Sequence, residues 1–180
     1  MEQHTTVMGV VNRRMNSIRV ILNYWKKGDF NSVINGLGMM NDTSVVMDVL
    51  NHTFADNQKI EMLNYENVAN LLPHCIVLVN SKYETHILAG LKSTSNILTH
   101  FAGEIIKIKT VPVSGGVDLA REERLKKCEA CVEQFYNFFK SKGFQKALKR
   151  KGEVAEIAMN LHGKLTMFLN KTKAQAAECE

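Results

Sequence analysis

Two cysteines, Cys128 and Cys131, have the spacing of zinc-binding and thiol-redox motifs. A structural zinc site needs four ligands, and the sequence offers no second pair of cysteines or histidines at a matching spacing. A thioredoxin-like motif would follow a β-strand, whereas these residues lie in a helical pattern whose apolar stripe includes Cys128. We therefore expect a buried structural thiol pair and no metal.

Other residue types that could do catalysis are scattered. None of the six histidines forms an HExxH motif or stands in a recognisable triad order. Gly36-x-Gly38 and Gly115-Gly116 are followed by no Lys-Ser/Thr, so they do not match a phosphate-binding loop. Neighbouring carboxylates such as Glu122 and Glu123 lie beside basic residues, which favours ion pairs on a helix surface over acid–base catalysis. We expect no enzymatic activity and no cofactor.

The most basic segment is residues 140–151, which contains six lysines or arginines and no acidic residue. It is either a solvated helix end or a strip that docks a polyanion, such as nucleic acid or an acidic protein. The sequence lacks the interleaved aromatic residues and sheet platform of single-strand RNA readers, so an acidic protein is favoured. The candidate contact residues are Lys142, Lys146, Lys149 and Arg150.

A second basic segment, Arg121-Glu122-Glu123-Arg124, lies in the first turn of an expected helix. Cations are mildly unfavourable there because the helix dipole is positive at this end. Carboxylates of a partner would offset that cost, and so would an internal charge network with the two glutamates. The residues themselves leave both possibilities open.

The elements that must position these residues belong to one domain. The chain has 180 residues, of which 45% are hydrophobic and 23% charged, and this composition excludes global disorder. Apolar runs such as residues 75–79 are far shorter than the roughly 20 residues that cross a bilayer. The N-terminus lacks a signal-peptide pattern, so we expect reduced cysteines in a cytosolic or nuclear protein with no membrane partner. The net charge of +5 favours an acidic partner.

Helical spacing dominates the first half of the chain. One helical face carries apolar residues at intervals of 4, 3, 4 and 3, namely Val11, Met15, Ile18, Leu22 and Trp25. A short helix should contain residues 33–37, and residues 41–44 should cap the next one. A further helix is expected from Asn64 to Asn80, with a kink or break at Pro73.

The second half begins with a capping-box pattern, in which Ser81 is the expected N-cap and Glu84 stands three residues later. After a loop at 111–117, Asp118 should cap a helix with the apolar stripe Leu125, Cys128, Val132, Phe135 and Phe139. Gly143 and Gly152 interrupt the C-terminal part of the chain, and a last helix should hold Ile157, Leu161, Leu165 and Phe168. We predict an all-α domain over residues 5–170, with 171–180 as a disordered tail. Its six to eight helices would stack antiparallel as an armadillo/HEAT-like array or an irregular bundle.

Taken together, several segments resemble the C-terminal domain of the regulatory, non-catalytic subunit of katanin, the microtubule-severing complex. The resemblance covers roughly residues 5–140, and its most specific part is Gly116–Leu125 followed by Lys127-Cys128. The β-propeller and linker of that subunit are missing from this chain. The other matching segments are Arg19–Leu22, Trp25, Gly28-Asp29, Asn41-Asp42, Ser44–Val46, Asp48, Leu50-Asn51, Leu71–Pro73 and Ser81–Glu84.

The resemblance implies a stacked helical adaptor that binds the N-terminal helical bundle of katanin's catalytic ATPase subunit. Such a heterodimer binds microtubules and short peptides of spindle-pole and minus-end proteins. The expected location is the cytoplasm and cytoskeleton, at the spindle pole or centrosome. Nucleic acid is not an expected partner of that family, and remains the alternative ligand of the 140–151 segment.

Individual residues take roles from the same resemblance. Tyr83 matches a tyrosine implicated in peptide binding, and Arg124 matches an arginine implicated in microtubule binding. Because tubulin is acidic, the neighbouring Arg121 and Lys127 are assigned to the same surface. A helix-on-helix interface with the catalytic subunit is expected on the first helix, through Trp25, Leu22 and Ile18, although plain core packing explains these residues equally well.

Overall fold

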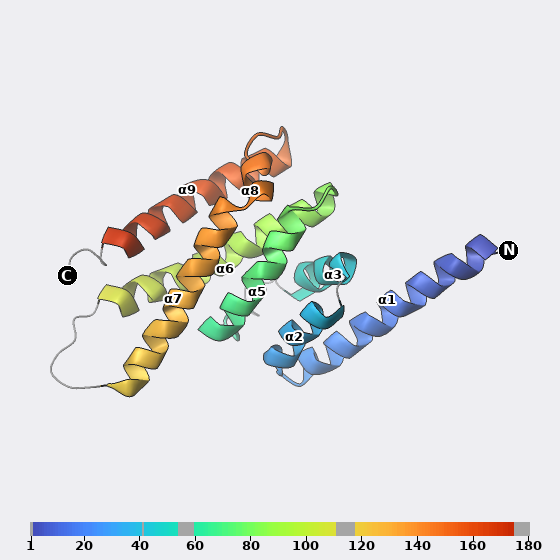
Figure 1. The fold of residues 1–180 in the computed structure, drawn as a ribbon, viewed down its shortest axis with the longest axis horizontal. Coiled ribbons are helices and arrows are strands. Elements are labelled where there is room, and N and C mark those ends of the chain that lie inside the picture. Colours follow the sequence, from blue (N-terminus) through green and yellow to red (C-terminus); the bar gives the residue numbers. More distant parts are fainter. Residues whose placement is uncertain (1, 41, 54–59, 111–117, 175–180) are drawn as a thin grey trace.

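The computed structural model describes residues 2–40, 42–53, 60–110 and 118–174, which form helices and no strand (Figure 1). This confirms the all-α class. The expected loop at 111–117 lies outside the described residues. The eight helices described are α1 (Glu2–Lys26), α2 (Phe30–Met40), α3 (Thr43–Thr53), α5 (Tyr65–Val79), α6 (Glu84–Thr110), α7 (Leu119–Lys140), α8 (Lys142–Ala147) and α9 (Glu153–Ala174).

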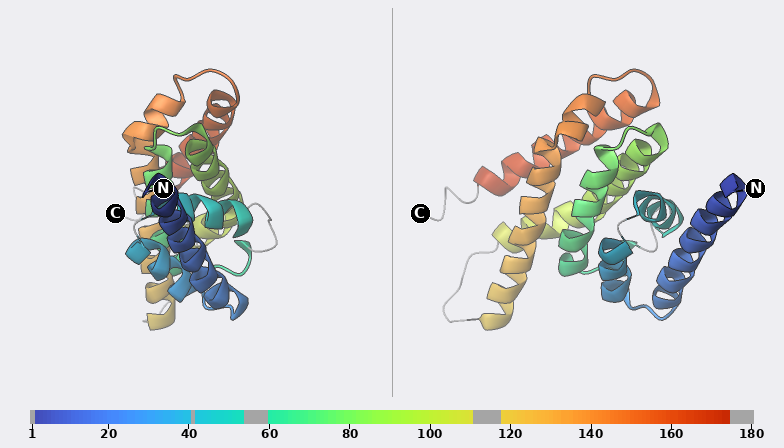
Figure 2. Two further views of the ribbon diagram at one scale, coloured as in Figure 1. Left: turned by 90° about the vertical axis from the view of Figure 1, so that its right-hand side faces the viewer. Right: turned by 45° about the vertical axis from the view of Figure 1, so that its right-hand side comes forward.

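The helices form an elongated array rather than a closed bundle (Figures 1 and 2). α5 packs against both α6 and α7, and α9 covers α6 on the far side. α2 and α3 continue the array toward α1, whose N-terminal half projects away from the other helices (Figure 2). None of the helices described is both long and apolar enough to span a bilayer.

The core follows the helical spacing closely in α6. Its stripe from Ile87 through Leu91, Leu98 and Ile105 is buried, and Thr94 is buried with it. The Thr94 hydroxyl donates to the carbonyl of Gly90 at 2.8 Å, so this polar side chain is satisfied inside the core.

α7 departs from the single stripe that the sequence predicts. Cys128 and Phe135 are fully buried as expected, but Cys131 and Phe138 are buried too. Of the other predicted stripe members, Leu125, Val132 and Phe139 are only partly buried. The reason is that α7 contacts α5, α6 and α9, so more than one of its faces is covered.

Two helix boundaries differ from the prediction. α5 runs without a break from Tyr65 to Val79 through Pro73, because buried residues on both sides of the proline hold the helix together. Ser81 does not act as the N-cap of α6, which begins at Glu84. The Ser81 Oγ instead accepts from the amide of Tyr83 at 3.2 Å, and the Tyr83 carbonyl accepts the first helical bond, from Ile87.

Two further predictions concern the C-terminal part. Gly143 was expected to interrupt the helices but lies inside α8, whereas Gly152 has φ of +75° and does separate α8 from α9. The predicted disordered tail begins too early, because α9 continues as a helix through Ala174. Thr172 in this last turn is buried and bonds to the carbonyl of Leu169, which explains why the helix persists there.

Candidate interaction surfaces

The first surface is α1, which is covered along only part of its length. Ile21 is fully buried, and the Trp25 ring meets Phe30 edge-on at 4.9 Å between centroids. Arg14 forms an ion pair with Asp48 of α3, with its Nε 2.8 Å from the carboxylate. The predicted interface residues Ile18, Leu22 and Trp25 are half-buried, so they lie at the margin of the core.

The N-terminal half of α1 exposes apolar side chains that the sequence analysis did not assign to a partner. The exposed fractions are between 42% and 59%. The signal was present in the spacing, because Met8, Val11 and Met15 extend the 3–4 pattern that continues through Ile18 and Leu22. Spacing cannot show that no other helix covers this row. The exposed apolar residues are Val7, Met8, Val10, Val11 and Met15.

The second surface surrounds Tyr83, in the turn between α5 and α6. Its side chain is 55% exposed, and the ammonium of Lys82 lies 5.1 Å from its ring centroid. The ring of buried His86 lies 5.2 Å from the Tyr83 ring, and its Nδ1 is 3.3 Å from Ser81 Oγ. The exposed Tyr83 ring therefore packs beside the buried His86 side chain, which interacts with Ser81.

The third surface is the start of α7, where Asp118 caps the helix by accepting from the Arg121 amide at 3.1 Å. Lys127 lies 2.9 Å from Glu123 and 3.8 Å from Glu66 of α5. The hydrogen bond with Glu123 raises the pKa of Lys127, and the same bond lowers the pKa of Glu123. Arg124 is exposed and forms no ion pair within the described residues. The structure thus places Arg121, Arg124 and Lys127 on successive turns of one helix.

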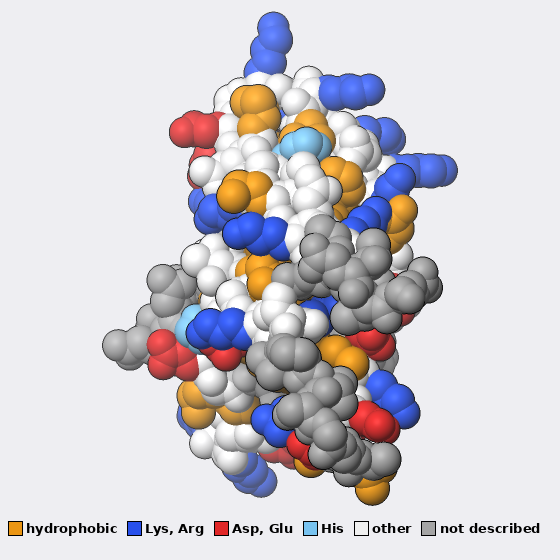
Figure 3. Space-filling view, turned by 90° about the vertical axis from the view of Figure 1, so that its left-hand side faces the viewer, with side chains coloured by type: hydrophobic (Ala, Val, Ile, Leu, Met, Phe, Trp, Pro, Cys, Tyr) orange, Lys and Arg blue, Asp and Glu red, His pale blue; other side chains and the backbone are white. Residues whose placement is uncertain are grey.

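The fourth surface, which we call the basic end, consists of Lys82, Lys142, Lys146, Lys149, Arg150 and Lys151, all exposed. Ser141 begins α8 by accepting from the amide of Phe144 at 3.3 Å. Figure 3 shows Lys and Arg side chains gathered over the upper end of the molecule, where α8 and the turn before α9 lie. The four predicted strip residues therefore lie on α8 and the turn after it, and the hydrogen bond from Gly143 to Asn80 connects α8 to the turn that carries Lys82.

The cysteines that the structure describes lie in the core. Burial raises the pKa of Cys128 to about 11 and those of Cys131 and Cys75 to about 12. Cys131 Sγ donates to the carbonyl of Tyr65 at 3.0 Å. Across the described ranges, no three His, Cys, Asp or Glu side chains are placed to hold a metal. Thiols with such high pKa values are poor nucleophiles at neutral pH.

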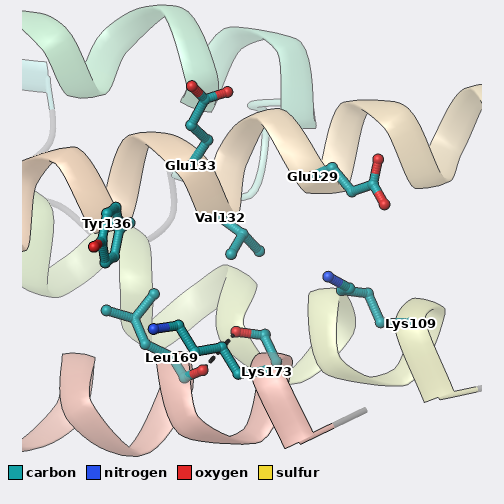
Figure 4. A pocket seen from close by; sticks show the side chains of 8 residues that line it. Lys109, Glu129, Val132, Glu133, Tyr136, Leu169 and Lys173 are labelled. Atoms are coloured by element: carbon teal, nitrogen blue, oxygen red, sulfur yellow. Dashed lines mark hydrogen bonds between the residues drawn. The ribbon is translucent and has the colours of Figure 1, made fainter. Parts of the chain in front are cut away.

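A shallow cavity of about 380 Å³ lies where α7 faces α9 and the end of α6. Figure 4 shows Tyr136 and Val132 of α7 facing Leu169 and Lys173 of α9. The ammonium groups of Lys140 and Lys173 lie 5.4 and 5.3 Å from the Tyr136 ring centroid. Its lining combines lysines and glutamates with apolar side chains, and the hydroxyl of Thr172 donates to the carbonyl of Leu169.

Residues 2–165 match the protein family described as the con80 domain of katanin. The chain belongs to the katanin con80 family. The matched region contains all four surfaces, and it extends beyond Lys140 through α8 and into α9, where the resemblance seen in the sequence had faded.

Individual relatives of this con80 chain are katanin p80 subunits. The chain is 36% identical over 131 residues to the katanin p80 WD40 repeat-containing subunit B1 of Xenopus tropicalis, and 34% identical over 134 residues to that of Gallus gallus. It is 27% identical over 162 residues to the Arabidopsis thaliana homologue KTN80.3. These alignments cover 73%, 74% and 90% of this chain but only 20%, 20% and 18% of the relatives. The con80 chain thus spans about a fifth of each relative.

Proposed function

We propose that this con80 domain is a non-enzymatic adaptor of katanin, which corresponds to the C-terminal domain of the regulatory subunit. It binds the N-terminal helical bundle of the catalytic ATPase subunit and helps to dock the complex on microtubules. Its location would be the cytoplasm and the microtubule cytoskeleton, including the spindle pole. The observation that carries the proposal is the apolar row on the projecting half of α1, in a chain that belongs to a katanin family.

The α1 row is suited to packing against helices of another chain. Residues Met8, Val11 and Met15 repeat at intervals of three and four, which is the spacing of a helix–helix seam. The row leads directly to Ile18 and Leu22, which are half-buried and would form the inner edge of the interface. Burying exposed apolar side chains of this size contributes roughly 25 cal/mol per Å² to association.

Microtubule docking is assigned to the start of α7. Arg124 extends into solvent without an ion pair in the described part of the chain, so its guanidinium is available to the carboxylates of tubulin. Arg121 and Lys127 flank it by one turn on each side. Glu122 and Glu123 lie between these cations, so the surface carries charges of both signs. It would attract an acidic partner and favour the orientation that matches these charges.

Peptide binding is assigned to Tyr83, because an exposed tyrosine on a rigid turn is a common anchor. The peptides would come from spindle-pole or minus-end proteins, as the family resemblance implies. The adaptor therefore has separate surfaces for the catalytic subunit, the microtubule and a recruiting peptide.

The direct test is gel filtration of the full chain with the N-terminal helical region of a katanin catalytic subunit. We expect co-elution at micromolar concentration. Replacing Val11 and Met15 with glutamate should weaken binding more than about tenfold, because each change puts a charge into an apolar interface. Both side chains are more than 40% exposed, so helix content should not change.

The matched control is Met159→Glu on α9, a methionine that is 59% exposed and far from α1 in the array. It should co-elute like the unmodified chain. Failure of the unmodified chain to co-elute, or equal losses in both variants, would contradict the proposed interface.

A further inference from the structure

The end of α5 and the start of α8 are joined by a contact that only glycine permits. The amide of Gly143 donates to the side-chain carbonyl of Asn80 at 2.8 Å. A Cβ at Gly143 would lie 2.4 Å from the carbonyl oxygen of Val79 and 2.7 Å from the amide nitrogen of Asn80. Both are backbone atoms and cannot turn aside like a side chain. The end of α5 therefore holds α8 in place, and with it the relative positions of the cations in the basic end.

The cations of α8 and of the turn that follows it lack carboxylate partners in the part of the chain that the structure describes. Among the described residues, Lys142, Lys146, Lys149, Arg150 and Lys151 form no ion pair. The carboxylate that comes after them in the chain, Glu153, is 2.8 Å from Lys92 of α6. Like charges gathered in one short segment repel each other, and an anionic ligand would relieve that repulsion.

The form of the basic end indicates what kind of anion it takes. Its exposed cations follow one another along α8 and the turn before α9, with Lys82 beside them, and five of the six are lysines. Lysine ammonium groups attract anions as point charges, so this surface would respond to a run of negative charges rather than to the geometry of one bidentate anion. Tyr83 is the exposed aromatic ring beside this surface, and a single ring is not the series of stacking platforms that single-stranded nucleic acids use.

We propose that the basic end binds an acidic, extended polypeptide segment rich in glutamate or aspartate. An extended segment of roughly six to eight residues spans about 20–25 Å, which is longer than the single short helix α8. This site differs from the start of α7, which lies at the opposite end of α7 (Figure 1). The inference does not depend on the proposed catalytic-subunit interface, because it concerns the isolated con80 chain.

The experiment measures fluorescence anisotropy of labelled octaglutamate with the full chain, without the catalytic subunit. We expect binding that weakens steeply as ionic strength rises toward ~0.15 M. The variant Lys146→Glu with Lys149→Glu should bind at least about tenfold more weakly, because two attractive charges become repulsive. Both residues are exposed, so circular dichroism and melting temperature should remain those of the unmodified chain.

The matched control is Lys26→Glu with Lys27→Glu, which makes the same change in net charge at the exposed end of α1. It should lose at most about twofold in affinity, since α1 lies away from α8 in the array (Figure 1) and salt screens distant charges. Equal losses in the two double variants would overturn the proposal, because they would show a response to net charge alone. Tighter binding of a single-stranded RNA with the same number of charges than of octaglutamate would also overturn it, in favour of nucleic acid.

Discussion

The start of α7 and the basic end are both rich in cations but differ in what surrounds them. At the start of α7, Lys127 lies between Glu123 and Glu66, and Arg124 follows Glu123 in the chain. At the basic end, the α8 cations have no carboxylate partner among the described residues. A mixed surface favours a partner only in the orientation that matches its charges, whereas a surface of one sign attracts many acidic chains.

The ion pair between Lys127 and Glu123 sets how the start of α7 responds to pH. The pKa of Glu123 is lowered from its usual 4.5, so the stability of the pair with Lys127 is present above that pH and is lost as the pH falls. The pKa of Lys127 is raised from 10.5, so its contribution is complete below that value and is lost as the pH rises through the folded pKa. Around neutral pH the pair is fully charged, and only salt weakens it.

The largest expected effect comes from breaking the backbone contact that holds the basic end in place. Gly143→Val should lower the free energy of unfolding by about 3 kcal/mol, because its side chain would overlap the backbone of Val79 and Asn80. Urea denaturation measures this loss. At urea concentrations below the unfolding midpoint of the variant, its octaglutamate binding should be weaker because the lysines of α8 move relative to Lys82. Its microtubule binding through Arg124 should be retained.

The control for this change is a glycine with open space around it. Gly103 is exposed on α6, and an added Cβ would meet no atom within 4 Å apart from its chain neighbours and the backbone of its own helix. Gly103→Ala should raise the free energy of unfolding by up to about 1 kcal/mol, because alanine favours helix. If Gly143→Val proved as harmless as this control, the contact between α5 and α8 would not be what positions the basic end.

A charge reversal at each region should separate their roles. Arg124→Glu should weaken microtubule pelleting by about tenfold at low salt, because it removes an unpaired cation and adds to the neighbouring glutamates. Its octaglutamate binding should stay within about twofold of the unmodified chain. Co-sedimentation over a salt series measures the first effect, and Lys146→Glu is the reciprocal variant. Equal pelleting of both variants would mean that microtubules do not distinguish the two regions.

Much of the fold could be predicted from local pattern. The last helix with Leu161, Leu165 and Phe168 and the capping role of Asp118 follow from the local pattern of a single helix, and both were confirmed. The continuity of α5 through Pro73 could not be predicted, because burial of its flanking residues by other helices outweighs the lost hydrogen bond. Burial of Phe138 on α7 likewise depends on which neighbours the helix meets.

The candidate sites show the same limit. Sequence placed Lys142, Lys146, Lys149 and Arg150 in one strip, because neighbouring residues stay close in any fold. It could not add Lys82, since that position depends on the contact between Gly143 and Asn80. The exposure of the apolar row on α1 could not be predicted either, because an apolar helix face has the same sequence pattern whether its own domain or a partner covers it.

The smallest expected effect concerns Lys127, which already forms ion pairs with Glu123 and Glu66. Lys127→Ala should weaken microtubule pelleting only about twofold, less than Arg124→Ala, because part of the Lys127 charge is offset by Glu123 and Glu66. Parallel co-sedimentation of the two alanine variants measures the ranking. The difference should shrink as salt rises, since screening weakens the internal pairs and the contacts with tubulin alike. If Lys127→Ala lost more than Arg124→Ala, the paired lysine rather than the unpaired arginine would be the main contact, and the contrast with the basic end would fail at its central point.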